Sequence, residues 1–248
     1  MSLTREQHID KTVEWIREMV KTSHTKGVIV GLSGGIDSSV VAALLKRAFP
    51  EDSMGVILPC KSNNKDEEDA IALAEAIGIE YTTVDLSETH NVLYDGINKA
   101  LASTEHGNGR LTDANLRARL RMSTIYAIAN AKGYLVAGTD NKAEVHTGYF
   151  TKYGDGGVDF IPIANLPKRE VFAWAEVLGV PKQIIDRKPS AGLWEGQTDE
   201  SEMGTTYDMI DDYLDGKEIP EKDKVIIDRM HAATEHKRNM PPAPPIFE

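Results

Sequence analysis

Cysteine is nearly absent from this sequence, and its absence excludes several kinds of site. Cys60 is the single cysteine among 248 residues, so neither an internal disulfide nor a CxxC zinc or redox site is expected. No apolar stretch approaches the roughly 18–20 residues that a membrane-spanning helix needs. The N-terminus is polar and shows no secretory signal. We therefore expect an intracellular, cytoplasmic protein with no membrane segment.

Basic residues are also in the minority. Asp and Glu number 39 against 28 for Lys and Arg, which gives a formal net charge of −11. No block rich in Lys and Arg is present that could follow a phosphate backbone, so no nucleic-acid partner is expected. Most of the acidic residues are expected to form a solvated surface. The excess of carboxylates would also suit ligands that arrive bound to a metal ion.

Short apolar runs alternate with helical patterns through the first half of the chain. The predicted strands are residues 27–32, 54–58, 80–84 and 133–137. The predicted helices between and before them are residues 4–21, 40–47, 66–77, 92–101 and 113–132. This alternation predicts an α/β fold, a doubly wound parallel sheet flanked by helices.

We expect one domain over residues 1–248. Its parts are an N-terminal helix (1–22), an α/β core (27–186), a mobile loop (187–206), and C-terminal helices with a Pro-rich tail (207–248). The loop is predicted because turn residues dominate it and periodicity is lost. The C-terminal helices are predicted at residues 207–214 and 221–236.

The most informative segment is Ser33–Ser38, which reads SGGIDS and lies between the first strand and a helix. Its glycines allow backbone N–H groups to turn toward an anion, and the helix N-terminus adds a positive dipole. Asp37 is able to hold Mg²⁺ against phosphate oxygens. The Walker lysine is missing, and GxGxxG has neither the acid nor the serines. The alternative is an ordinary Gly/Ser turn, but six specified residues in this context favour a phosphate-binding loop.

The SGGxDS pattern resembles the loop of the PP-loop ATP-pyrophosphatases, in which attack at the α phosphorus of ATP releases pyrophosphate. Several chemistries share that loop. Thiolating members carry catalytic cysteines, and members that modify tRNA need a basic surface; this sequence has neither. Glutamine-using members need an amidotransferase domain, whereas 32 residues precede Ser33.

Motifs in the second half resemble the ammonia-dependent NAD synthetases within that superfamily. They include Asn115–Met122 (NLRARLRM), Gly138–Glu144 (GTDNKAE) and Phe150–Asp159 (FTKYGDGGVD), of which the last is the most specific. Four further segments follow in family order: Leu166–Arg169, Pro189–Leu193, Tyr207–Asp211 and Glu235–Arg238. The resemblance extends from Gly31 to Arg238 and implies an adenine nucleotide alpha hydrolase-like fold and a homodimer.

The resemblance also implies roles for individual residues. The ATP-binding residues would be Gly31, Leu32, Ser33, Gly34, Gly35, Ile36, Asp37, Ser38, Thr139, Lys168 and Ser190. Contacts to deamido-NAD would come from Arg119, Lys152, Asp159, His236 and Lys237. Mg²⁺ would be held by Asp37 and Glu144, and catalysis would involve Asp37 and Lys168. Asp155 is a further catalytic candidate on its own chemistry, although an Asp beside glycines is often only a turn residue. At Ser190 many relatives have Thr, which keeps the hydroxyl.

Each of these assignments has an ordinary alternative. We expect Asp37 and Glu144 each to end a strand, at the edge where open α/β sheets bind ligands. The alternative is that both act only as strand-end caps. Lys168 begins a helix, where the dipole disfavours a cation, so a phosphate partner would explain it; an exposed lysine is also common. The arginines of NLRARLRM occupy alternate positions and cannot share one helix face, so at least one is expected to be solvated or ion-paired.

The implied reaction has two steps. The nicotinate carboxylate of deamido-NAD attacks the α phosphorus of ATP, and ammonia then attacks the acyl-adenylate to give NAD and AMP. Asp155 or Asp159 would orient the ammonia or accept a proton, and the loop at 187–206 would close to exclude water. Two alternatives stay open: another PP-loop ligase with a different acceptor, and a non-catalytic module that senses ATP. A sensor would not need Glu144, Lys152 and Asp159 in register with the loop.

Overall fold

The computed structural model describes residues 3–101, 109–188 and 198–247. Within them, four parallel strands form a sheet of order β3-β2-β1-β4. The strands are β1 (Gly27–Gly31), β2 (Ser53–Ile57), β3 (Glu80–Thr83) and β4 (Tyr134–Val136). In register, Ile29 of the central strand β1 lies beside Met54 of β2 and Val136 of β4.

The helices account for most of the remaining chain. In chain order they are α1 (Arg5–Thr22), α2 (Ile36–Ala48), α3 (Asn64–Ile77), α4 (Ser87–Ala100), α5 (Gly109–Lys132), α6 (Lys142–Thr147), α7 (Lys168–Leu178), α8 (Lys182–Ile185), α9 (Asp199–Met203), α10 (Tyr207–Leu214), α11 (Glu221–Ala233) and α12 (Glu235–Arg238). Among the described helices, none is both long and apolar enough to cross a membrane.

Local sequence explains where the helices begin and end. Thr4 caps α1 through a capping box with Gln7, and the helix buries a stripe of aliphatic residues that includes Ile9 and Ile16. Gly78 ends α3 with φ of +67°, the left-handed conformation that glycine adopts without steric cost.

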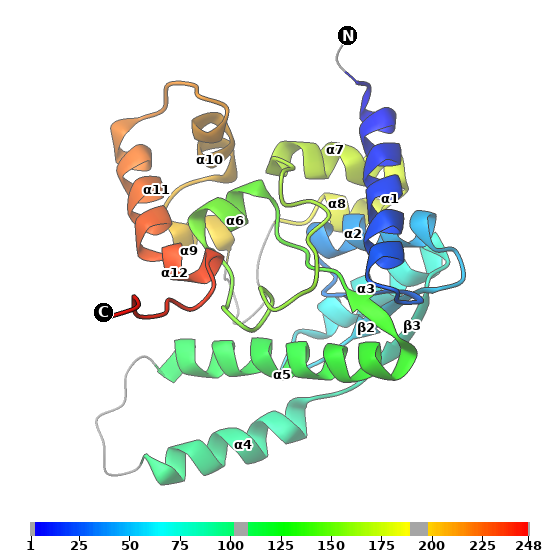
Figure 1. The fold of residues 1–248 in the computed structure, drawn as a ribbon, viewed down its shortest axis with the longest axis horizontal. Helices are drawn as coiled ribbons and strands as arrows, with labels where there is room; N and C mark the ends of the chain where they lie inside the picture. Colours follow the sequence, from blue (N-terminus) through cyan, green and yellow to red (C-terminus); the bar gives the residue numbers. More distant parts are fainter. Residues whose placement is uncertain (1–2, 102–108, 189–197, 248) are drawn as a thin grey trace.

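Helices cover both faces of the sheet. On one face α2 and α3 pack on the strands, and α1 and α7 pack in turn on α2. On the other face α5 packs along β1 and β4, with α4 lying against its outer side (Figure 1). The predicted doubly wound parallel sheet flanked by helices is therefore confirmed, and one side of α5 is buried against its own sheet.

The strand order creates a crevice beside β1. The chain runs from β1 to β2 to β3 in one direction across the sheet, and β4 then returns to the opposite side of β1. Because the connecting helices at this reversal lie on opposite faces, the carboxyl ends of β1 and β4 leave space between them. Both SGGIDS, after β1, and GTDNKAE, after β4, lie at that edge.

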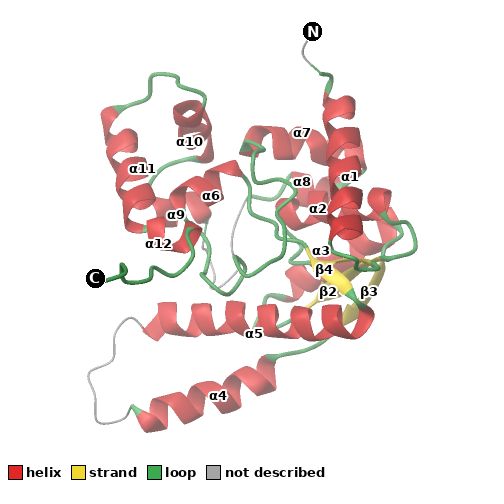
Figure 2. Cartoon of the chain, viewed as in Figure 1, coloured by secondary structure: helices red, strands yellow, loops and turns green. Residues whose placement is uncertain are grey.

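The C-terminal helices form a second, all-helical lobe beside the sheet. Helices α6 and α9–α12 gather on the left in Figure 2, away from the strands. A small apolar cluster joins them, composed of Ala143, Met203, Tyr207, Ile210 and Ile227. The short helix α9 lies in the segment predicted to be irregular, since Thr198 caps its start and Gly204 ends it. Residues 189–197 of that segment lie outside the described residues.

Candidate active site

A cavity of about 1130 Å³ opens at the carboxyl ends of β1 and β4. The phosphate-binding loop predicted from the sequence forms part of its wall. The loop residues that line it are Gly31, Leu32, Ser33, Gly35, Ile36, Asp37 and Ser38. Thr139, after β4, lines the opposite side. Ser190 lies outside the described residues.

Gly34 gives the loop its shape. Its φ is +75°, and a Cβ at this position would lie 2.4 Å from the backbone oxygen of Asp66. Two hydroxyls brace the turn, since Ser33 Oγ lies 3.0 Å from Ser38 Oγ and also accepts a hydrogen bond from the Gly35 N–H. The start of α2 is thereby fixed facing the cavity, where its free N–H groups favour an anion.

Lys168 connects two carboxylates beside the loop. Its Nζ lies 2.6 Å from Asp37 Oδ2 and 3.4 Å from Glu144 Oε1, and its side chain is only 3 % exposed. Burial opposes the charged ammonium, but the carboxylates of Asp37 and Glu144 outweigh it and raise the pKa of Lys168. The three side chains come from α2, α6 and α7, so the fold assembles them from distant segments.

Asp37 and Glu144 do not end strands, and that expectation was wrong. Asp37 lies in the first turn of α2, after an intervening loop. Glu144 lies in the first turn of α6, where Asn141 caps the helix and accepts from the Glu144 N–H. Glu144 completes a capping box by accepting from the Asn141 N–H at 3.0 Å. Two helix N-termini, rather than two strand ends, therefore present the carboxylates.

The environment of Glu144 favours its protonated form. Burial raises its pKa to about 7, although the ammonium of Lys168 acts in the opposite direction. Its Oε1 accepts a hydrogen bond of 2.8 Å from the Tyr207 hydroxyl, which lies 3.0 Å from Asp199 Oδ2 as well. Glu144 is therefore a carboxyl group whose charge responds to any cation that enters the site.

The position of Lys168 depends on the C-terminal lobe. Asp211 of α10 is buried and accepts from the backbone N–H groups of Lys168 and Arg169, at 3.1 Å each. This side chain thus satisfies two free donors at the start of α7. The Lys168 ammonium also lies 4.4 Å from the centre of the Tyr207 ring. No local pattern in the sequence predicts these contacts.

The donor set is compatible with Mg²⁺ only when phosphate takes part. Asp37 and Glu144 supply two hard carboxylates, both already directed at one cation, the Lys168 ammonium. In the part of the chain that the structure describes, no group of three or more His, Cys, Asp and Glu side chains gathers as a metal site. Mg²⁺ commonly binds through one or two carboxylates together with phosphate oxygens and water. The residues present fit that mode.

The residues predicted to contact a dinucleotide fall into two groups. Arg119 donates to the Lys152 carbonyl at 3.3 Å, and Lys152 in turn bonds the carbonyl of His236, so these three are linked. Lys237 follows directly and lines the cavity, donating to the Gly148 and Phe150 carbonyls.

Asp159 is placed differently. Its carboxylate accepts from the Tyr126 hydroxyl at 3.0 Å and from the Val136 N–H at 2.8 Å. These contacts fasten the glycine-rich segment to β4 and α5. Of the five residues predicted to contact the dinucleotide, Lys237 lines the cavity, whereas Asp159, Arg119, Lys152 and His236 do not.

The arginines of NLRARLRM separate as the helical geometry requires. Arg117 pairs with Asp113 one turn earlier, while Arg119 is exposed and reaches Lys152. Arg121 points toward the cavity and donates to the Leu58 carbonyl and to Ser62 Oγ, at 3.0 Å each. Arg121 is thus a cavity residue that the sequence did not single out.

Comparisons with known proteins agree on one family. The family model for NAD synthase matches residues 8–241. An NH(3)-dependent NAD(+) synthetase of Alkaliphilus oremlandii is 59 % identical over 99 % of this chain and its own full length. Among solved structures, an NMN synthetase from Francisella tularensis superposes with a TM-score of 0.91 at 38 % identity, covering 99 % of this chain and 100 % of the other. An NH3-dependent NAD synthetase from Campylobacter jejuni, solved with nitrate, gives 0.76 at 31 % identity, with full coverage of both chains.

Proposed function

Since this chain belongs to the NAD synthase family, we propose that ATP is activated where Asp37, Glu144 and Lys168 meet. The protein is an ammonia-dependent NAD synthetase, a ligase that forms an amide bond at the expense of ATP. The observation that carries the site assignment is the Lys168 ammonium held between Asp37 and Glu144, directly beside the phosphate-binding loop.

In the first step, the nicotinate carboxylate of deamido-NAD attacks the α phosphorus of ATP and pyrophosphate leaves. The loop Ser33–Ser38 binds the β and γ phosphates through backbone N–H groups and hydroxyls. Lys168 places a fixed positive charge where negative charge develops on the phosphoryl oxygens. Mg²⁺ bound by Asp37 and Glu144 would neutralise phosphate charge. Thr139 and Ser190 belong to the same ATP-binding set.

In the second step, ammonia attacks the carbonyl carbon of the acyl-adenylate, and AMP leaves. The deamido-NAD contacts would come from Arg119, Lys152, Asp159 and the pair His236 and Lys237. The bond between Lys152 and the His236 carbonyl supports this grouping, because it holds two of these segments together. Asp155 lines the cavity, which supports its proposed role in orienting ammonia or accepting a proton.

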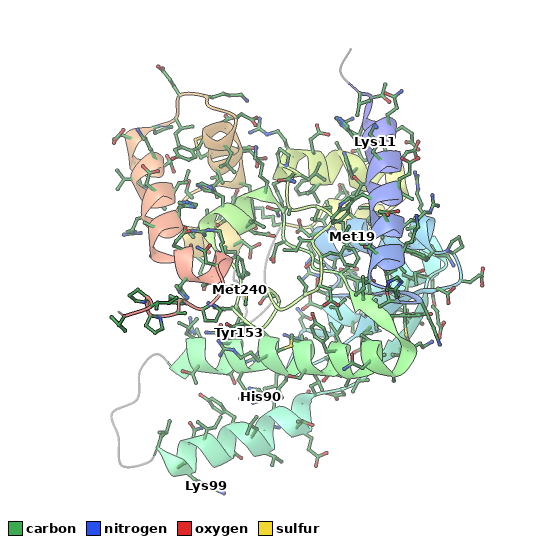
Figure 3. The ribbon with its side chains drawn as sticks, in the orientation of Figure 1. Lys11, Met19, His90, Lys99, Tyr153 and Met240 are labelled. Atoms are coloured by element: carbon green, nitrogen blue, oxygen red, sulfur yellow. The ribbon has the colours of Figure 1, made fainter. Side chains whose placement is uncertain are left out.

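We include a homodimer in the proposal, with α4 and α5 as its surface. Val92 and Leu93 of α4 are 69 % and 44 % exposed, and Leu111 of α5 is 54 % exposed. The two helices face each other through His90, which is fully buried between them with Nε2 3.1 Å from Asp113 Oδ1 (Figure 3). Since α4 contacts the body mainly through α5, its apolar outer side is available to a second copy. A cytoplasmic location is part of the same proposal.

One assay tests the reaction and its acceptor. Purified protein is incubated with ATP, Mg²⁺ and ammonium, with deamido-NAD, with nicotinate mononucleotide, or without an acceptor. AMP, pyrophosphate and amidated product are quantified. We expect NAD, AMP and pyrophosphate in equal amounts only with deamido-NAD. Faster turnover of the mononucleotide would move the assignment toward the activity named for the Francisella relative. Acceptor-independent pyrophosphate release would contradict both.

A further inference from the structure

One buried carboxylate in the cavity has no role in the scheme above. Asp140 lies between Thr139, after β4, and Asn141, which caps α6. It is 6 % exposed and lines the cavity. No hydrogen bond or ion pair of its carboxylate is found among the described residues.

The neighbouring carboxylates are all occupied. Asp37 is bound by Asn141 and Lys168, and Glu144 by Lys168 and Tyr207. Asp155 Oδ1 accepts from the Thr151 N–H at 3.0 Å. A buried carboxylate without such a partner is costly, because it has lost its water shell and gained nothing in exchange. Among Asp37, Asp140, Glu144 and Asp155, Asp140 is therefore the one for which the described residues provide neither a cation nor a donor.

The charges around Asp140 make a small cation its natural ligand. The strongest charge effects on it come from Asp155, Glu144 and Asp37, which are of its own sign, and Lys237 opposes them. Lys237 is already committed to the carbonyls of Gly148 and Phe150. Burial, with these like charges, raises the pKa of Asp140 well above its usual range. A cation bound at Asp140 would offset both the cost of burying its charge and its repulsion by the neighbouring carboxylates.

The reaction itself supplies such a cation. The nitrogen donor is mostly ammonium near neutral pH, and ammonium carries only hydrogen-bond donors. It must lose a proton before its lone pair can attack a carbonyl carbon. A carboxylate with a raised affinity for protons is the chemical group that both binds ammonium and accepts that proton.

We propose that Asp140 is the ammonium-binding residue of this enzyme, which captures the nitrogen donor in the cavity and takes one proton from it. This inference rests on the proposed function. The N–H bond breaks and its proton passes to the Asp140 carboxylate. The freed lone pair forms the C–N bond to the acyl carbon, and the C–O bond to AMP breaks with its electrons leaving on AMP. A second proton is lost from nitrogen to solvent, which leaves the neutral amide. Asp155, whose carboxylate already accepts from the Thr151 N–H, would help to orient the donor.

The test separates the two half-reactions in the variant Asp140→Asn, which keeps the shape and removes the charge. Adenylation is followed by deamido-NAD-dependent exchange of pyrophosphate into ATP without ammonium, and amidation by NAD formation at varied ammonium. We expect normal exchange and a KM for ammonium raised about tenfold or more, since a charged hydrogen bond is lost. The variant's rate should recover as pH rises, because free ammonia then needs no base. The matched control is Asp10→Asn, which removes one exposed carboxylate on α1.

Three outcomes would overturn the inference. They are an unchanged KM for ammonium, an equal loss in both half-reactions, and a defect that added Mg²⁺ rather than added ammonium relieves. A wild-type protein that shows no deamido-NAD-dependent exchange would contradict the proposed function, and this inference with it.

A binding measurement gives a readout besides activity. Ammonium chloride should raise the Tm of the wild type more than tetramethylammonium chloride does at equal ionic strength, because the methyl groups remove every donor. Asp140→Asn should lose this difference, whereas Asp10→Asn should keep it. Equal shifts in wild type and Asp140→Asn would contradict ammonium binding at this residue.

Discussion

The ammonium of Lys168 lies 2.6 Å from the carboxylate of Asp37, although 131 residues separate them in the chain. The pair is almost enclosed, with side-chain exposures of 3 % and 20 %. Removing one partner of such a pair leaves the other charge buried without compensation. The contact therefore matters both to the folded state and to the proposed chemistry.

Replacement of Lys168 by methionine should reduce turnover by about 10²-fold or more, since one strong electrostatic partner of the phosphoryl oxygens is lost. Stability should fall as well, because Asp37 and Glu144 lose their shared cation. Lys142→Met is the matched control. Lys142 also begins a helix, but its Nζ pairs with Asp215 Oδ1 near the surface, at 3.8 Å. Steady-state kinetics and thermal unfolding of both variants give the measurement, and equal effects would contradict the special role of Lys168.

The pH dependence of stability should carry the signature of Glu144. Its folded pKa, about 7, is above the usual value of 4.5, so the folded state holds this proton more tightly than the unfolded state. The stability from this group is complete below the unfolded pKa and is lost as pH rises through the folded value. The Tm of the free protein should therefore fall more between about pH 5 and about pH 8 than that of Glu144→Gln. Parallel curves for the two proteins would exclude Glu144 as the source.

Binding of ATP with Mg²⁺ should release a proton near neutral pH. A cation at Asp37 and Glu144 favours the charged carboxylate and so lowers the pKa that burial has raised. Calorimetry in buffers of different ionisation enthalpy measures the protons released. In Glu144→Gln the release should be smaller. The same release in both proteins would place the titrating group elsewhere.

Gly34→Ala should destabilise the predicted phosphate-binding loop by more than the cost of placing alanine at a positive φ. The strained φ costs about 1–2 kcal/mol for alanine, and here the new Cβ would also press on the Asp66 carbonyl at 2.4 Å. Gly78→Ala is the control, because its φ of +67° is similar and open space surrounds it. We expect a higher KM for ATP and a lower Tm in Gly34→Ala than in Gly78→Ala. Similar values would show that the contact with Asp66 is easily relieved.

Val92→Glu should dissociate the proposed dimer. A charge on the apolar side of α4 would have to be buried in the interface, which costs more than the interface gains there. Val225→Glu on α11 is the control, since Val225 is 55 % exposed and lies on the other lobe. Sedimentation velocity should show a monomer for the first variant and the wild-type species for the second. A dimer in both variants would show that α4 does not form the interface.

Most of the sheet could be read from the sequence, because buried parallel strands are short apolar runs between glycines and charged turns. The position of the Ser33–Ser38 loop between β1 and α2 was also predicted, because its glycines and serines are local requirements. Its binding of phosphate stays a prediction. No local sequence pattern predicts that Asp37, Glu144 and Lys168 lie together. Only the family resemblance assigned them to one site. Glu144 was wrongly predicted to end a strand because the helix-start pattern N-x-x-E, from Asn141 to Glu144, was overlooked.

The segment Tyr207–Asp211 was part of the family resemblance, but the contacts of Tyr207 and Asp211 could not be predicted from the sequence. Each acts on a residue in another element, Asp211 on the start of α7 and Tyr207 on Glu144. Such contacts depend on how the C-terminal lobe docks, which periodicity does not encode. Asp140 lay inside a quoted motif, but only the cavity revealed that it lacks a partner.

The cap that Asp211 places on α7 has a consequence for the order of events on the ribosome. The backbone N–H of Lys168 cannot receive its cap until α10, more than forty residues later in the chain, has emerged and docked. The sheet and its phosphate loop are complete well before that point, by the end of β4. In a nascent chain the strands that border the cavity are therefore complete before the residue that caps α7 has been made. A chain that ends before α10 lacks the Asp211 carboxylate that caps the start of α7 at Lys168.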